Sequence, residues 1–193
     1  MKGARPLNQC EVRALLRSIR GSYAVRDRCL VELGLNVGLR ISNLVRLTVG
    51  QVSHAGRPLR YLRLPAREMK SRRGHTIPLN SPARARIEEM LRWKKHMGEP
   101  TELTAPLFRS REGGCMTTRR AAQIISSAAD RAGLEPGVST HSLRKTLATT
   151  LMERGVSLRV VQELLGHREL ATTAQYLGVG RKALEDGVRM LET

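Results

Sequence analysis

The sequence has few aromatic residues, no paired cysteines and no long apolar run. Its 193 residues include one Trp, one Phe and three Tyr, too few for the stacking platform on which proteins hold single-stranded nucleic acid. Cys10, Cys29 and Cys115 form neither a CxxC pair nor an even set, which favours buried, reduced thiols over a disulfide framework or a zinc site. Neither a signal peptide nor an apolar stretch of about 20 residues is found. We therefore expect a cytoplasmic protein with no membrane partner.

Acidic residues are also scarce relative to basic ones. Lys and Arg number 34 and Asp and Glu number 17, which gives a formal net charge of +17 at pH 7. Such an excess is typical of proteins that bind a polyanion, nucleic acid above all. Because the basic residues are spread along the whole chain, they indicate a folded surface that contacts the backbone of a duplex.

Helical periodicity covers most of the chain. Asn8 and Glu11 have the spacing of a capping box and predict a helix to Ile19. Further helices are expected over 26–37, 41–47, 81–97, 117–132, 142–154, 157–165, 171–176 and 181–191. Extended runs at 59–64 and 75–79, joined by the polar SRRG segment, predict a small hairpin. The expected fold is α+β and mainly helical, with a small antiparallel sheet on one edge, in a single domain over residues 1–193.

The segment 140–179 carries the residues best suited to chemistry. His141 and Arg144 stand three residues apart at a helix start, which predicts that both side chains project from one face. His167 follows the glycine that ends the next helix, and Tyr176 comes nine residues later. Taken singly, each has an ordinary alternative role as a helix cap or a solvated surface residue. Together, two basic side chains, a histidine and a tyrosine on short neighbouring elements can converge on one phosphate and predict a phosphoryl-transfer site.

These residues resemble the signature of the tyrosine recombinases, the phage integrase family. HSLRK, LGH and TTAQY match the family pattern HxLR and LGHxxxxTTxxY, with the His-to-Tyr interval intact. NVGLRIS resembles the segment of the family's first catalytic arginine, which gives that role to Arg40. The family's catalytic lysine lies in a β-hairpin eight residues before a proline, as Lys70 stands to Pro78 in KSRRGHTIPL. The resemblance covers about residues 7–191 and implies a Xer-like catalytic domain with the tyrosine recombinase fold.

The resemblance implies a catalytic site of six side chains: Arg40, Lys70, His141, Arg144, His167 and Tyr176. The two arginines neutralise the non-bridging phosphate oxygens, and His167 adds a donor. Tyr176 is the expected nucleophile, with His141 as its base and Lys70 as the acid that protonates the 5′-hydroxyl leaving group. A 3′-phosphotyrosyl link results, and no metal, ATP or other cofactor is implied. Further DNA contacts are expected from Arg72, Arg73, Arg119, Arg120 and Lys145.

The function implied is site-specific recombination of double-stranded DNA, with integration or excision of a mobile element as the expected role and resolution of chromosome dimers left open. The resemblance implies a homo-tetramer on DNA and leaves the state of the free protein open. Two alternatives remain: a non-catalytic DNA-binding regulator on the same scaffold, and an activity like that of a type IB topoisomerase. Tyr23 and Tyr61 are the other tyrosines, and their positions in a linker and on a strand favour packing roles.

Three features depart from the family pattern. Asn43 stands where many relatives have an acidic residue, and Lys145 stands where His or Arg is common. The N-terminal core-binding domain that closes the family's clamp on DNA is expected to be absent. Residues 178–193 resemble the family's C-terminal extension, whose helix docks on a neighbouring protomer; packing on its own domain is the alternative.

Overall fold

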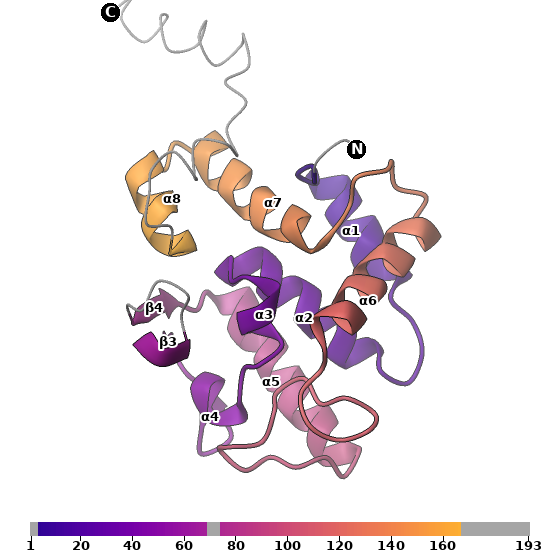
Figure 1. Ribbon diagram of the computed structural model, residues 1–193, viewed down its shortest axis with the longest axis vertical. Coiled ribbons are helices and arrows are strands. Elements are labelled where there is room, and N and C mark those ends of the chain that lie inside the picture. The colour runs from indigo at the N-terminus through magenta and orange to yellow at the C-terminus, as the bar shows by residue number, and fades with distance from the viewer. Residues whose placement is uncertain (1–3, 69–73, 167–193) are drawn as a thin grey trace, which may run out of the picture.

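In this computed structural model the structure describes residues 4–68 and 74–166, a mainly helical body with two small hairpins (Figure 1). In chain order its elements are α1 Gln9–Ser18, α2 Ala24–Val37, α3 Ile41–Leu44, α4 Val49–Val52, β1 Ser53–His54, β2 Arg57–Pro58, β3 Tyr61–Leu64, the 3₁₀ helix Ala66–Glu68, β4 His75–Pro78, α5 Ser81–His96, α6 Thr118–Arg131, α7 Thr140–Glu153 and α8 Leu158–Leu165. The predicted α+β, mainly helical class is confirmed. None of the helices in these two ranges is long and apolar enough to cross a membrane.

Capping residues in the sequence decide where the helices begin. The Asn8 side chain accepts from the Glu11 amide and the Glu11 carboxylate accepts from the Asn8 amide, both at 2.9 Å, so the predicted capping box is confirmed. Asn80 caps α5 through the amide of Ala83 at 2.9 Å. Ser139 caps α7, which therefore begins at Thr140, two residues before the predicted start.

Strands β3 and β4 form the hairpin that the sequence predicts. They pair antiparallel, with Leu64 opposite His75 and Tyr61 opposite Pro78. The second hairpin, β1 with β2, and the short helix α4 were not predicted, because segments of two to four residues are too short to show a period. Strands β1 and β3 both contact α4, and the β3–β4 hairpin lies on the side of the molecule where α8 also lies (Figure 1).

The two other tyrosines differ in their surroundings. Tyr23 packs as expected, with its ring centroid 5.8 Å from that of Trp93 and 4.3 Å from the guanidinium carbon of Arg26. Tyr61 is 52% exposed, so the prediction that it packs is wrong. Alternation along β3 buries Leu62 instead and turns Tyr61 to solvent.

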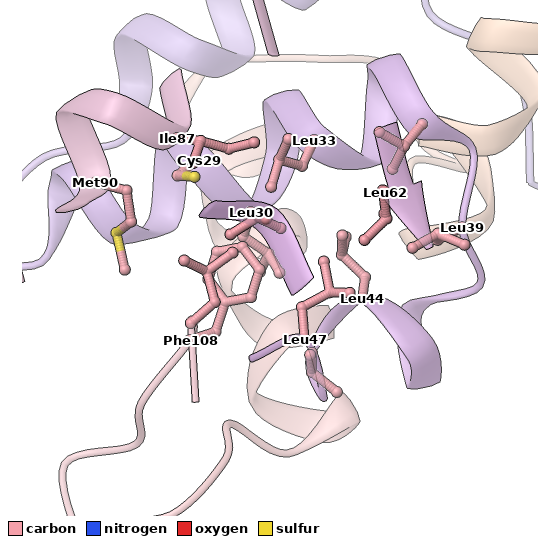
Figure 2. Close-up of a cluster of buried hydrophobic side chains, with 14 of the residues drawn as sticks. Cys29, Leu30, Leu33, Leu39, Leu44, Leu47, Leu62, Ile87, Met90 and Phe108 are labelled. Carbon is pink, nitrogen blue, oxygen red and sulfur yellow. The ribbon is translucent and has the colours of Figure 1, made fainter. Parts of the chain in front are cut away.

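The main core lies between α2, α5 and the inner face of the β3–β4 hairpin (Figure 2). Leu30 and Leu33 of α2 and Phe108 of the long loop before α6 are fully buried in it. Helix α2 also packs against α7: a Cβ built on Gly34 would lie 2.6 Å from Cδ1 of Leu143. This close approach fixes the first turns of α7, where the predicted site residues begin.

Helix α8 has a smaller apolar contact. Its Val161 and Leu165 form a cluster with Ala148 of α7 that is separate from the main core. Leu164 of α8 packs against the main core, and polar contacts at the end of α8 add to these apolar ones.

The three cysteines are free thiols, as expected, but only one of them is buried. Cys29 lies in the main core, whereas Cys10 and Cys115 are exposed. The expectation of buried thiols is therefore wrong for two of the three, since neither lies on the apolar face of a described element.

Candidate catalytic site

Arg40 lies in the short connection between α2 and α3. Helix α2 ends at Gly38, and Arg40 is the N-cap residue of α3, with extended backbone angles. Its carbonyl accepts from the amides of Asn43 and Leu44, at 2.9 and 3.0 Å. The backbone of Arg40 is thus fixed by a helix on either side, and its side chain is half-buried.

Arg144 of α7 is buried, with 4% of its surface exposed. Its Nη1 donates to the carbonyl of Gly38, and its Nη2 donates to the carbonyl of Leu165 at 2.8 Å. These acceptors belong to the C-terminal ends of α2 and α8. Such carbonyls have no partner within their own helix and carry the negative end of its dipole, so both favour a cation. We call this set of contacts the Arg144 clamp.

The side chains of two leucines also pack closely against the backbone at Gly38. A Cβ built there would lie 2.7 Å from Cδ2 of Leu147 on α7 and 2.7 Å from Cδ2 of Leu165 on α8. Its φ of 60° is left-handed, a conformation that glycine adopts without steric cost. Three segments that lie far apart in the sequence therefore meet around Gly38 and the guanidinium of Arg144. They are VGLR, HSLR and LLG.

His141 lies on the first turn of α7 and is exposed. Its amide donates to Oγ of the capping residue Ser139 at 3.3 Å. Arg144 follows one turn later and is buried, so the helix presents the histidine to solvent and the arginine to the clamp.

The remaining predicted residues divide into two groups. Lys145 is half-buried on α7, and Arg119 and Arg120 are exposed on the first turn of α6. The others lie outside the described residues: Lys70, Arg72, Arg73, His167 and Tyr176. The expected C-terminal helix over 178–193 lies outside them as well.

One residue near the clamp was missed by the sequence reasoning. His75 begins β4, and its Nε2 lies 3.0 Å from the carbonyl oxygen of Leu164. A carbonyl oxygen can only accept, so this bond places a proton on Nε2. The sequence offers one signal, that His75 stands five residues after Lys70, but the strand pattern does not indicate which element its side chain contacts.

Three of the clear pKa shifts in the described part of the chain belong to residues of α1 and α2. Burial raises the pKa of the Cys29 thiol, and it raises the pKa of the Glu32 carboxyl despite the ion pair with Arg86. The side-chain hydrogen bond from Arg5 lowers the pKa of Glu11. Among the same residues, no group of three or more His, Cys, Asp or Glu side chains is placed to hold a metal.

The described elements form the catalytic-domain fold of the tyrosine recombinases. The crystal structure of XerA recombinase matches with a TM-score of 0.80 at 21% identity, over 100% of this chain and 67% of that one. XerH recombinase, bound to a palindromic difH substrate in a post-cleavage complex, matches with a TM-score of 0.76 at 22% identity, over 100% of this chain and 54% of that one.

The chain belongs to the phage integrase family, whose model matches residues 5–182. Tyrosine recombinase XerD of Mycobacterium tuberculosis is 36% identical over 168 residues, which cover 86% of this chain and 52% of XerD. The chain thus spans about half the length of the curated relatives it matches. The family resemblance predicted from the motifs is confirmed.

Proposed function

We propose that this chain is the catalytic domain of a site-specific recombinase that cleaves and rejoins double-stranded DNA through Tyr176. The Arg144 clamp is the observation that supports this best, because it gathers the segments that carry Arg40 and Arg144 and the segment that leads to His167. The Arg144 guanidinium contacts the backbone at Gly38, two residues before Arg40, and two arginines on segments that meet suit the two non-bridging oxygens of a phosphodiester. The net charge of +17 agrees with a DNA partner, and so does the DNA-bound state of the XerH structure.

In the proposed reaction, the phenolic oxygen of Tyr176 attacks the scissile phosphorus and the bond from phosphorus to the 5′-oxygen breaks. His141 takes the phenolic proton, because a tyrosine with a pKa of about 10 is protonated at neutral pH. Lys70 gives a proton to the departing 5′-oxygen. Arg40, Arg144 and His167 bind the non-bridging oxygens while charge develops on them.

The product of this step is a 3′-phosphotyrosyl ester, which retains the energy of the broken bond. The 5′-hydroxyl of another strand can attack the ester and release Tyr176, so the scheme uses neither ATP nor a metal. Exchange between two duplexes needs four such sites, and we propose a tetramer on DNA that integrates or excises a mobile element in the cytoplasm. Arg119, Arg120 and Lys145, with Arg72 and Arg73, are the proposed contacts with the DNA backbone.

The test is covalent trapping on nicked duplexes that carry candidate sites from the DNA flanking the gene. A denaturing gel separates the protein–DNA adduct from free protein. We expect an adduct with the unchanged chain, none with Tyr176→Phe, and a normal amount with Tyr61→Phe, the matched control at an exposed tyrosine. An adduct that persists in Tyr176→Phe would refute the assignment of the nucleophile.

Two other results would favour the alternative functions. DNA binding without any adduct would support a non-catalytic regulator. Relaxation of a supercoiled plasmid that lacks a recombination site would support an activity of the type IB topoisomerase kind.

A further inference from the structure

The segment before α1 is hydrogen-bonded to the connection between α6 and α7. Three consecutive carbonyls of this connection all accept from Arg5. The carbonyl of Glu135 accepts from Nη2 at 3.1 Å and that of Pro136 from Nε at 3.3 Å. The carbonyl of Gly137 accepts from the backbone amide of Arg5 at 3.1 Å. One residue therefore binds three peptide units in a row, far along the chain from itself.

The guanidinium of Arg5 is held in this orientation by Glu11 of α1. Its Nη1 and Nη2 donate to the two carboxylate oxygens of Glu11, at 3.0 and 2.6 Å. The same carboxylate accepts from the amide of Asn8 in the capping box. Because a bidentate pair with a carboxylate fixes the plane of the guanidinium, the remaining N–H groups of Arg5 are aimed at the connection.

The connection continues through hydrogen bonds into the first turn of α7. The fully buried hydroxyl of Ser142 donates to the Gly137 carbonyl at 3.2 Å. It also accepts from the amide of Ser139 at 3.0 Å. Oγ of Ser139 in turn accepts from the amide of His141 at 3.3 Å. The Gly137 carbonyl is therefore shared between Arg5 and the capping residues that hold the backbone of His141.

A second contact ties the same N-terminal segment to the body of α7. The amide of Leu7 donates to Oγ1 of Thr146 at 2.8 Å, and this hydroxyl donates to the carbonyl of Ser142 at 2.7 Å. This contact does not involve the side chain of Arg5. Loss of the guanidinium therefore leaves the helix attached through Leu7, while the connection before the helix loses two of its three bonds from Arg5.

We propose that Arg5 is a positioning residue for His141. Its guanidinium holds the connection 135–137, and the connection fixes the cap of α7 from which the His141 side chain projects. The inference rests on the proposed function, because His141 acts as the base for Tyr176 only there. A misplacement of about 1 Å can lower a catalytic rate on the order of 100-fold, so a shift of the cap has a measurable effect.

The experiment compares two arginine substitutions on the nicked duplexes of the trapping assay. Arg5→Gln removes the guanidinium and keeps the backbone amide. Arg17→Gln is the matched control, because it removes the same charge from an exposed arginine on the last turn of α1. The single-turnover rate of adduct formation is measured over a range of DNA concentrations, at a temperature where the melting curves show every variant folded.

We expect Arg5→Gln to lower the maximal rate by about 10-fold, less than the roughly 100-fold or more that a general base contributes. The DNA concentration that gives half the maximal rate is expected to equal that of Arg17→Gln, since Arg5 places a base and binds no DNA. A partly unfolded population would reduce the amount of adduct and leave the rate constant unchanged.

The variant His141→Gln tests whether Arg5 acts through His141. Effects of residues that act as one unit do not add, so Arg5→Gln is expected to change the rate of His141→Gln by less than about 2-fold. Three outcomes would overturn the inference. They are an unchanged maximal rate for Arg5→Gln, an effect confined to the half-saturating DNA concentration, and an equal loss in the presence and absence of His141.

Hydrogen exchange tests the contact without reference to catalysis. The amides of Ser139 and His141 are expected to exchange faster in Arg5→Gln than in the unchanged chain or Arg17→Gln, because a loosened connection opens more often. Equal exchange in all three proteins would overturn the inference even if no adduct formed. A failure of the proposed function is distinct: the unchanged chain would form no adduct that depends on Tyr176, and the catalytic part of the inference would fall with it.

Discussion

Replacing Gly38 by alanine tests whether α7 and α8 close on the end of α2. The added methyl group enters a space where Cδ2 of Leu147 and Cδ2 of Leu165 both lie 2.7 Å from the new carbon, less than van der Waals contact. The substitution also imposes a side chain on a backbone with φ of 60°. Both effects act at the residue whose carbonyl accepts from Arg144.

The two effects can be given separate magnitudes. A left-handed backbone costs an L residue roughly 1–2 kcal/mol. An extra methyl group forced into a packed site costs typically about 1–3 kcal/mol more. We therefore expect Gly38→Ala to lower the free energy of unfolding by about 2–5 kcal/mol, a large share of the roughly 5–15 kcal/mol of an ordinary domain.

The assay is urea denaturation, with Gly133→Ala as the matched control. Gly133 has φ of 63°, close to that of Gly38, but a Cβ built there meets no atom within 4 Å. The control therefore contains the backbone cost alone, about 1–2 kcal/mol. The difference between the variants, about 1–3 kcal/mol, measures the close approach of α7 and α8. In addition, Gly38→Ala is expected to slow adduct formation under conditions where it is folded, because it displaces a carbonyl of the Arg144 clamp.

Equal losses of stability in the two variants would refute this reasoning. The leucines would then not contact Gly38, and the meeting of α7 with the ends of α2 and α8 would need another explanation.

Three further predictions concern described residues away from Gly38. Native protein should react with a thiol reagent at two cysteines and denatured protein at three, because Cys29 is fully buried and burial raises its pKa; three fast-reacting thiols in native protein would contradict the packing of α2. The pKa of Glu11 is lowered, first by the hydrogen bond from Arg5. The ionised carboxylate therefore stabilises the fold at any pH above the ordinary pKa of the carboxyl, and this stabilisation is lost as the pH falls through the lowered pKa. Glu11→Gln should therefore lower the melting temperature more at pH 7 than at pH 2, and an equal decrease at both values would disprove the linkage. Arg144→Lys should lower the free energy of unfolding, measured in urea, by about 2 kcal/mol or more. One ammonium group does not reproduce both hydrogen bonds of the planar guanidinium, and each hydrogen bond to a charged group contributes about 1.5–3 kcal/mol. An unchanged free energy of unfolding would show that the Arg144 clamp does not stabilise the fold.

Helix boundaries and the hairpin could be predicted from the sequence because their causes are local. Asn8 and Asn80 precede their helices by one residue and cap them, and a cap acts within three residues of itself. The errors also have local causes. Helix α4 and the β1–β2 hairpin have too few residues for a detectable period, and the Ser139 cap was overlooked at the start of α7.

The candidate site was predicted only as a set of residue types and spacings. The motifs suggested Arg40, His141 and Arg144, but not that Arg144 is buried between two helix ends. Its acceptors lie 106 and 21 residues away in the sequence, and no periodic pattern carries information over such distances. His75 was missed for the same reason, since its acceptor lies 89 residues away.

By itself, therefore, the sequence determined the helical class, the caps at Asn8 and Asn80, the presence of the hairpin and the family, because each follows from residues close together in the chain or from motifs of defined spacing. Only the tertiary structure decided which helix ends meet, that two leucines approach Gly38 closely, and that Arg144 and His75 complete the end of α8. The physical reason is that a cation or an N–H donor binds whichever carbonyl the packing brings within about 3 Å. Packing depends on the shapes of all the elements together.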